Sequence, residues 1–120
     1  MCSITIQRSI AEPLNQSYFQ SEHLLFEPTS PNLNAVNIVF AFPSSYTVGI
    51  TSLGYQGVWA NLATRSQVNV RRWFTDAHED LPRQVEILGF SFSWELDYVN
   101  ILGALQKFGI PIDTSDRTDE

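Results

Sequence analysis

The sequence predicts an α/β fold: an open, mostly parallel sheet of about four strands with helices on both faces, arranged as a three-layer sandwich. Three observations lead to this prediction. A near-continuous apolar run at residues 36–42 has the composition of a strand buried on both faces. From there on, segments of strand character alternate with segments of helical spacing. The length of 120 residues suits one domain with a core that needs no disulfides.

The first strand is expected at residues 36–42 and ends at Pro43, because proline cannot donate a hydrogen bond to the sheet. A loop then leads into a helix that begins near Gly54, where apolar residues recur with helical spacing. These residues are Tyr55, Val58, Trp59, Leu62 and Ala63. Thr51 or Ser52 is placed to cap this helix, since its hydroxyl oxygen can accept from an exposed backbone N–H.

Two further strands and a second helix are expected after the first helix. Alternating residues predict a strand at 67–74, followed by a polar loop or single helical turn at 75–83. A third strand is expected at 85–93, and an amphipathic helix at 96–108. The apolar face of that helix is built from Val99, Leu102, Leu105 and their neighbours. Residues 110–112 are a candidate fourth strand, which completes an order typical of Rossmann-like and flavodoxin-like folds.

Residues 1–35 differ from the rest of the chain, because they are rich in Ser, Asn, Gln and Pro. We interpret them as an irregular leader or arm. Its apolar cluster at 24–26 either lies across the core or belongs to a partly disordered segment. The α/β domain then spans 36–113, and residues 114–120 form an acidic tail or a truncation point.

Composition and charge exclude several classes of function. The net charge of −6 argues against binding the nucleic-acid backbone. The single cysteine, Cys2, excludes an internal disulfide and a multi-cysteine zinc or iron–sulfur site built from this chain alone. No apolar run approaches the ~20 residues of a membrane span, and the N-terminus lacks the features of a signal peptide. A cytoplasmic location without a membrane partner is therefore expected.

Ligands of open parallel sheets bind outside the carboxyl ends of the strands, and this rule selects the loops at 43–54 and 91–98. The first loop offers hydroxyls and glycines before a helix N-terminus, which favours an anion or a polar cofactor group. Ordinary helix capping is the alternative. The second loop carries Glu95 and Asp97, which suit acid–base chemistry or a metal, or else complement the dipole of the following helix.

His78 lies in an Asp-x-His segment, which is also found in cobalamin proteins whose histidine ligates cobalt from below. In those proteins a glycine follows where this chain has Leu81, and the segment follows the first strand rather than the second. We therefore expect His78 to be a solvated loop histidine. His23 lies in the leader, and no Ser/His/Asp or Cys/His catalytic set can be assembled.

Three segments resemble a known family. Residues 42–56 resemble the Tyr-Pro-Asn-x-Tyr-x-Val-Gly-Met-Ser-Asn-Leu-Gly-x-Gln segment of radical S-adenosylmethionine (SAM) proteins that carry an N-terminal cobalamin-binding-like domain. Residues 88–101 are similar to a second block of that family, and residues 109–111 to a third. Together the blocks cover about residues 36–117 in the family's order and spacing. The Trp-Glu-Leu-Asp-Tyr-Val-Asn-Ile-Leu segment looks most like cyanobacterial members.

The resemblance implies a cofactor-binding or substrate-binding module of a radical SAM enzyme, non-catalytic by itself and here an excised or truncated N-terminal domain. Its partner would be the radical SAM barrel of the same parent chain, which holds a 4Fe-4S cluster and cleaves S-adenosylmethionine. The implied cofactor is cobalamin, bound base-off without a histidine ligand from the protein, or else no corrinoid at all. The alternative is a degenerate Rossmann-like interaction or structural domain that has lost cobalamin binding. A stand-alone flavodoxin-like or response-regulator-like protein fits less well, because 43–45 replaces a receiver's acidic residues.

The family segments also suggest which residues face a ligand, and all of them lie in or next to the two selected loops. They are Tyr46, Gly49, Ser52, Leu53, Gly54 and Gln56 in the first segment, and Ser91, Ser93, Glu95 and Asp97 in the second. No residue is assigned a catalytic or metal-binding role. The expected ligand is a small molecule.

Overall fold

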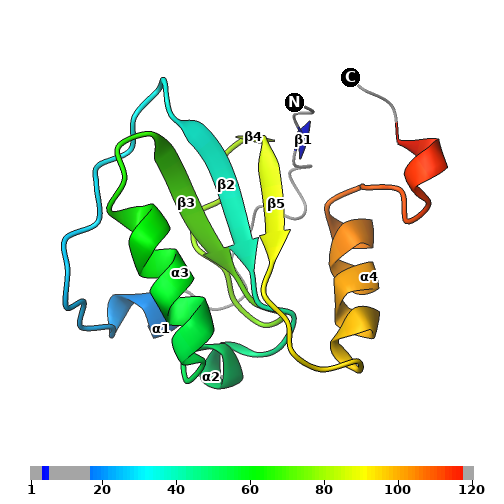
Figure 1. The fold of residues 1–120 in the computed structure, drawn as a ribbon, viewed down its shortest axis with the longest axis horizontal. Coiled ribbons are helices and arrows are strands. Elements are labelled where there is room, and N and C mark those ends of the chain that lie inside the picture. The colour runs from blue at the N-terminus through cyan, green and yellow to red at the C-terminus, as the bar shows by residue number, and fades with distance from the viewer. Residues whose placement is uncertain (1–3, 6–16, 118–120) are drawn as a thin grey trace.

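Parallel strands form the central sheet of the computed structural model, which describes residues 4–5 and 17–117 (Figure 1). Within these residues the sheet contains β2 (Val36–Ala41), β3 (Val68–Trp73) and β5 (Ile87–Phe90), in the order β3-β2-β5. The central strand, β2, pairs in parallel with both neighbours. The prediction of an α/β fold with an open parallel sheet is confirmed.

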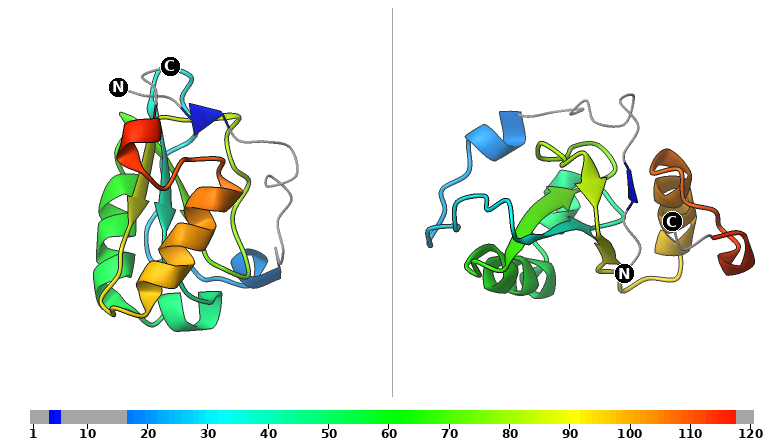
Figure 2. Two further views of the ribbon diagram at one scale, coloured as in Figure 1. Left: turned by 90° about the vertical axis from the view of Figure 1, so that its right-hand side faces the viewer. Right: turned by 90° about the horizontal axis from the view of Figure 1, so that it is seen from above.

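Helices cover both faces of this sheet, as the sequence predicts. Figure 2 shows α3 (Leu53–Ala63) and α4 (Asp97–Lys107) on either side of it. Successive residues of a strand point to opposite faces, and β2 illustrates this. The ring of Phe40 stacks on Tyr55 of α3, with centroids 4.5 Å apart. On the other face, Val39 and Ala41 belong to a buried cluster with Ala104 and Phe108 from the α4 side.

The N-terminal arm, defined here as residues 17–35, runs along the outer edge of β3. It contains α1 (Ser17–Gln20). The backbone N–H of Thr29 donates to the carbonyl of Ala63 at the end of α3 (2.8 Å). The side chain of Asn69 in β3 donates to the carbonyl of Asn32 (2.8 Å). The arm is thereby attached to the end of α3 and to a β3 side chain, whereas Glu79 bonds to the backbone of Arg72 in β3.

Short elements complete the described part of the chain. β1 (Ile4–Thr5) pairs with β4 (Gln84–Val85) in antiparallel register, apart from the central sheet. α2 (Tyr46–Gly49) follows β2, and a 3₁₀ turn, η1 (Thr114–Asp116), lies near the end of the chain. No helix among the described residues is both long and apolar enough to cross a membrane.

The prediction of a fourth strand at 110–112 is wrong, because the chain turns there instead. Gly109 has a φ of 71° and ends the α4 region, and Pro111 lacks the N–H that a ladder requires. The Arg117 side chain donates hydrogen bonds to the carbonyl oxygens of Pro111 (2.9 Å) and Ile112 (3.2 Å), which are therefore not available to a neighbouring strand. The third strand is also shorter than expected, since β5 ends at Phe90.

The predicted inner face of α4 is wrong in part. Val99 and Leu102 are exposed, and Leu105 is half-buried. The helix contacts the core through Ala104 and, just beyond its end, Phe108. The apolar residues of this helix spread over more of its circumference than one narrow sheet can cover, so part of the apolar face points outward.

Candidate functional site

Both predicted loops meet at the carboxyl edge of the sheet. The Ser91 N–H donates to the carbonyl of Ala41 at the end of β2 (3.0 Å). The Asn100 side chain donates to the carbonyl of Pro43 (2.8 Å), which ties the start of α4 to the first loop. The parallel topology explains this meeting, because all carboxyl ends of parallel strands share one edge.

The polar candidate residues of the first segment are bonded within the protein. The Tyr46 hydroxyl donates to a carboxylate oxygen of Glu22 in the arm (2.7 Å). Ser52 caps α3, as predicted, by accepting from the N–H of Tyr55 (3.3 Å). The Gln56 side chain donates to the carbonyl of Ile50 (3.0 Å). These contacts hold the loop in one shape and leave only part of each polar group's capacity for a ligand.

The remaining candidates of the first segment differ in burial. Gly49 is buried and lies directly against the ring of Phe74, so no side chain fits there. Leu53 and Gly54 are exposed at the start of α3, and a Cβ added to Gly54 would meet nothing within 4 Å.

The candidates of the second loop lie on the surface at the N-terminal end of α4. Ser91 and Asp97 are half-buried, whereas Ser93 and Glu95 are exposed. Asp97 lies in the first turn of α4, where its charge complements the helix dipole. This position fits the capping alternative for the acidic pair, although neither carboxylate makes a side-chain cap to the helix end.

The arm and the helices α2 and α3 enclose a groove of about 670 Å³, which we call the arm groove. It brings together three of the predicted residues, Tyr46, Leu53 and Gln56, and none from the second loop. The rest of its lining is Glu22, His23, Leu24, Leu25, Phe26, Ile50, Gly57, Trp59 and Ala60. A mostly apolar wall with a few polar groups, in a volume of this size, is typical of sites for small organic molecules.

An ion cluster beside the arm groove was not found by sequence reasoning. The Arg72 side chain is 2% exposed and bonds to both carboxylate oxygens of Glu22 (2.6 and 2.8 Å). It also bonds to Glu79 (3.1 Å), and its guanidinium lies 3.8 Å from the centre of the Trp59 ring. Together with the Tyr46 hydroxyl, these groups link the arm, α2, β3 and the following loop.

The pKa of Arg72 lies above its ordinary value. Burial alone lowers the pKa, but the hydrogen bonds and negative charges of Glu22 and Glu79 outweigh this effect. The sequence contains one signal of this cluster: strand alternation places Arg72 on the same face as Val68 and Val70. An arginine that lies on the same face of a strand as core residues is buried with them, and its charge then requires a partner.

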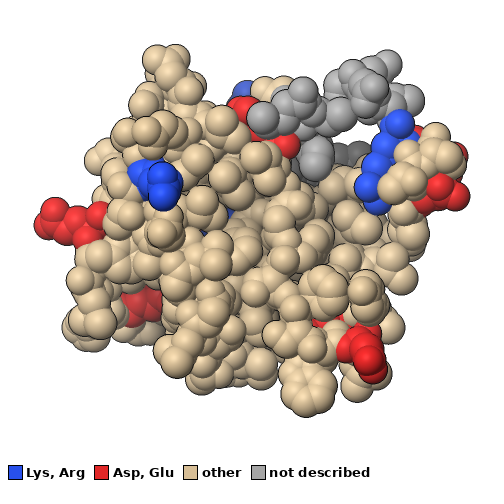
Figure 3. All heavy atoms as spheres, in the orientation of Figure 1, with Lys and Arg blue, Asp and Glu red and all other residues tan. Residues whose placement is uncertain are grey.

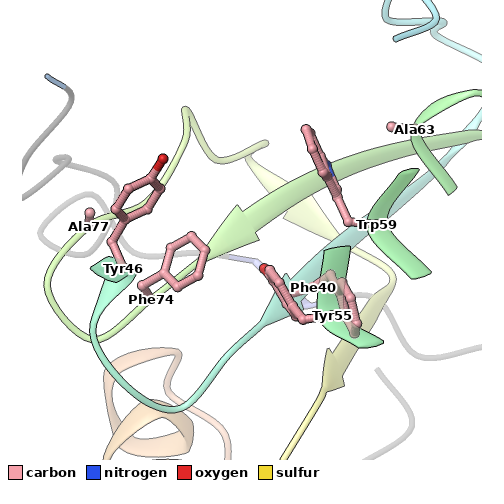
Figure 4. Close-up of a cluster of buried hydrophobic side chains, with 7 residues drawn as sticks. All are labelled: Phe40, Tyr46, Tyr55, Trp59, Ala63, Phe74 and Ala77. Carbon is pink, nitrogen blue, oxygen red and sulfur yellow. The ribbon is translucent and has the colours of Figure 1, made fainter. Parts of the chain in front are cut away.

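Aromatic rings fill the space behind the first loop (Figure 4). The ring of Phe74 lies edge-on to Tyr46 and to Tyr55, with centroids 5.2 and 5.5 Å apart. The Tyr55 hydroxyl donates to the carbonyl of Phe40 (2.7 Å). The first loop therefore rests on a packed aromatic cluster, and three of its candidate residues, Tyr46, Leu53 and Gln56, line the arm groove.

The pH dependence of the unfolding free energy tests the part that Tyr46 plays in this cluster. Burial, and then the hydrogen bond to Glu22 and its negative charge, raise the pKa of Tyr46 well above its ordinary value, while burial raises that of Tyr55. In the unfolded chain, tyrosine ionises near pH 10. The protonated Tyr46 therefore stabilises the folded state fully below that pH, and this contribution to the unfolding free energy is lost as the pH rises above it. We expect Tyr46→Phe to reduce the loss of unfolding free energy between about pH 9 and about pH 11 by up to ~1.4 kcal/mol per pH unit. Urea unfolding across this range measures the two slopes, and equal slopes would contradict the assignment.

The expectation that His78 is solvated is wrong. His78 is 2% exposed, and its Nδ1 lies 2.8 Å from the carbonyl oxygen of Glu79. The chain reverses direction here: the Phe74 N–H donates to the carbonyl of Ala77 (2.7 Å), and Trp73 forms a bridge with His78. The reversal buries a segment whose composition is that of a surface loop. Among the described residues, no group of three or more His, Cys, Asp or Glu side chains is arranged to hold a metal ion.

The family model described as radical SAM proteins, N-terminal, matches residues 55–120, just over half of the chain. The matched region includes Gln56 and all four candidates of the second loop. Comparisons with curated proteins and with solved structures found no match.

Proposed function

Because the chain belongs to the family of N-terminal regions of radical SAM proteins, we propose that it is a ligand-binding module of such a protein. In this proposal it binds a small organic cofactor or substrate in the arm groove and carries out no chemistry by itself. The S-adenosylmethionine and the 4Fe-4S cluster belong to the radical SAM barrel. The location proposed for the protein is the cytoplasm.

The arm groove is the observation that supports this proposal. Its volume of about 670 Å³ lies within the range of roughly 300–1,000 Å³ that small-molecule sites occupy. Leu25 and Leu53, which are 99% and 88% exposed, supply apolar surface, the half-buried Phe26 adds part of an aromatic ring, and Gln56 supplies an amide within the wall. Such a wall suits a ligand with a planar apolar portion and one or two polar groups.

Cobalamin is the ligand that the family resemblance suggests, and in our proposal it would be bound base-off without a protein ligand to cobalt. The described residues do not fit a corrinoid that is held through an axial histidine. The segment after β2 is Pro43-Ser44-Ser45, and His78 is buried in the reversal after β3. We therefore propose no reaction that involves the corrinoid, and a corrinoid serves below as one of two compounds that test binding to the arm groove.

A second candidate function, an interaction domain without a ligand, is favoured by a different observation. Tyr46, Ser52 and Gln56 each form a hydrogen bond within the protein, and Gly49 packs against Phe74. These contacts explain the residues of the first segment without any ligand. The two candidates therefore differ in whether the arm groove is occupied.

Gly57→Leu separates these candidates. Gly57 lines the arm groove, and a Cβ added there would meet nothing within 4 Å, so a leucine enters the groove without disturbing the core. We expect binding of hydroxocobalamin, or of the apolar dye anilinonaphthalene sulfonate, to weaken by at least about tenfold, or ~1.4 kcal/mol. Helix stability should be retained or increased, because glycine disfavours helix interiors by about 0.5–1 kcal/mol relative to alanine.

The matched control is Gly103→Leu. Gly103 also lies inside an eleven-residue helix, α4, with open space around the added Cβ, but it does not line the arm groove. Visible absorbance follows the corrinoid and fluorescence follows the dye. Binding that is lost in Gly57→Leu and kept in Gly103→Leu supports the proposed function. If neither probe binds the unmodified chain at high micromolar concentration, the interaction domain replaces it.

A further inference from the structure

A group of six exposed apolar side chains lies around the N-terminal end of α4, on the side of the sheet away from the arm groove. We call it the α4 surface and define it as Phe92, Trp94, Leu96, Tyr98, Val99 and Leu102. Leu96, Trp94 and Val99 are 82%, 74% and 72% exposed. The rings of Phe92 and Tyr98 contact each other edge-on, with centroids 5.0 Å apart. The three rings alone expose on the order of 300 Å², given the 150–250 Å² that each aromatic side chain carries.

The core of the domain does not account for this surface. Ala104 and Phe108 anchor α4 to the sheet, with Ile101 and Leu105 half-buried beside them. These four residues share one face of the helix, which is the face that meets the sheet. Val99 and Leu102 do not lie on that face. Leu96, Val99 and Leu102 are three residues apart, so they form their own stripe along the outer side of the helix. Exposed apolar patches of several hundred Å² mark interaction sites in proteins.

We propose that the α4 surface is the docking surface for the catalytic domain of the radical SAM protein. This inference rests on the proposed function only in placing the chain within such a protein. The α4 surface begins where β5 ends, at the carboxyl edge of the parallel sheet. A catalytic domain seated there would contact the second loop, where Ser93 and Glu95 are exposed. The arm groove, on the other side of the sheet, would stay accessible.

The charge around the α4 surface favours the catalytic domain over a second copy of this chain as the partner that docks there. Residues 91–102 contain Glu95 and Asp97 and no lysine or arginine. On the face shown in Figure 3, acidic but no basic side chains lie beside the lower end of α4. A two-fold dimer through this surface would bring identical acidic groups together, and unpaired like charges at an interface are unfavourable. The complementary partner has an apolar patch rimmed by arginine or lysine.

Thiol labelling tests this docking. In a Cys2→Ser background, Val99→Cys places one thiol on the α4 surface, where the side chain is 72% exposed and the substitution leaves the core intact. The labelling rate is measured for residues 1–120 alone and for the same residues joined to, or mixed with, the catalytic domain of their radical SAM protein. We expect the catalytic domain to slow labelling by at least about tenfold, since reaction then requires opening of the interface.

The control is Val58→Cys, an exposed valine on α3, which covers the other face of the sheet. Its labelling rate should not change when the catalytic domain is present. An unchanged rate at residue 99, or equal slowing at both positions, overturns the proposal. Sedimentation of residues 1–120 supplies a further criterion: a dimer that Val99→Asp dissociates would make a second copy the occupant. Because probe binding to the arm groove is measured on residues 1–120 alone, failure of the proposed function is distinguishable from failure of docking.

Discussion

Replacing Arg72 by methionine is expected to lower the free energy of unfolding by about 3 kcal/mol, near the lower end of the values for breaking a buried ion pair. Methionine keeps most of the apolar contact with Trp59 but removes the partner of two carboxylates, Glu22 and Glu79. These carboxylates are 12% and 22% exposed in the folded protein. Partial access to water limits the penalty for leaving them unpaired, which is why we do not expect a larger loss.

Urea unfolding followed by circular dichroism measures this effect, and Arg71→Met is the matched control. Arg71 is the half-buried neighbour in the same strand, and its side chain points to the opposite face of the sheet. The control should change the unfolding free energy by no more than about 0.5 kcal/mol. Arg72→Lys keeps the charge but loses the two-pronged contact with Glu22, so it should fall between the two. Equal stability of Arg72→Met and Arg71→Met would show that the ion cluster contributes nothing.

The same ion cluster connects stability to the candidate site. Glu22 belongs to the arm, and it is the residue through which both Arg72 and the Tyr46 hydroxyl hold the arm in place. Residues 22–26 form one wall of the arm groove. Loss of Arg72 therefore loosens a wall of the groove as well as the core, and probe binding in Arg72→Met should weaken together with stability.

The parts of the fold that depend on local chemistry could be predicted from the sequence. The apolar run that ends in proline predicts the first strand at 36–42, and β2 lies at Val36–Ala41. The start of α3 follows from Ser52, whose hydroxyl oxygen needs only a backbone N–H three residues away. Parallel topology then places both candidate loops at one edge without further information.

The parts that depend on distant residues could not be predicted. Glu22 and Arg72 are fifty positions apart, and nothing in the composition of the arm indicates which acidic residue pairs with the buried arginine. The burial of His78 depends on a chain reversal in a segment that is mostly polar. For α4, helical spacing identified an apolar helix correctly, but which side meets the sheet depends on the width of the sheet. For this reason Val99 and Leu102, which the spacing assigns to the inner face, instead belong to the exposed α4 surface.

Gly49→Ala is expected to destabilise the protein by about 3 kcal/mol, at the upper end of the usual cost of overfilling a core. The added methyl group would overlap the ring of Phe74, lying 2.8 Å from its Cδ1, and would be 3.1 Å from the ring of Phe42. Phe74 has no free side to move toward, since it is fully buried among Tyr46, Tyr55 and Phe19. Packing therefore accounts for a glycine at position 49 of this chain, whether or not a ligand binds.

Chemical denaturation of a double-mutant cycle identifies the clash as the cause. Phe74→Leu alone leaves a cavity and destabilises, but in combination with Gly49→Ala the smaller side chain makes room for the methyl group. The double variant should therefore be more stable than the two separate losses predict, by an interaction energy of about 1–2 kcal/mol. Gly54→Ala is the control: with nothing within 4 Å of its Cβ, it should leave stability unchanged or raise it by about 0.5 kcal/mol. Additive losses in the cycle would mean that Gly49 is needed for its backbone and not for its contact with Phe74.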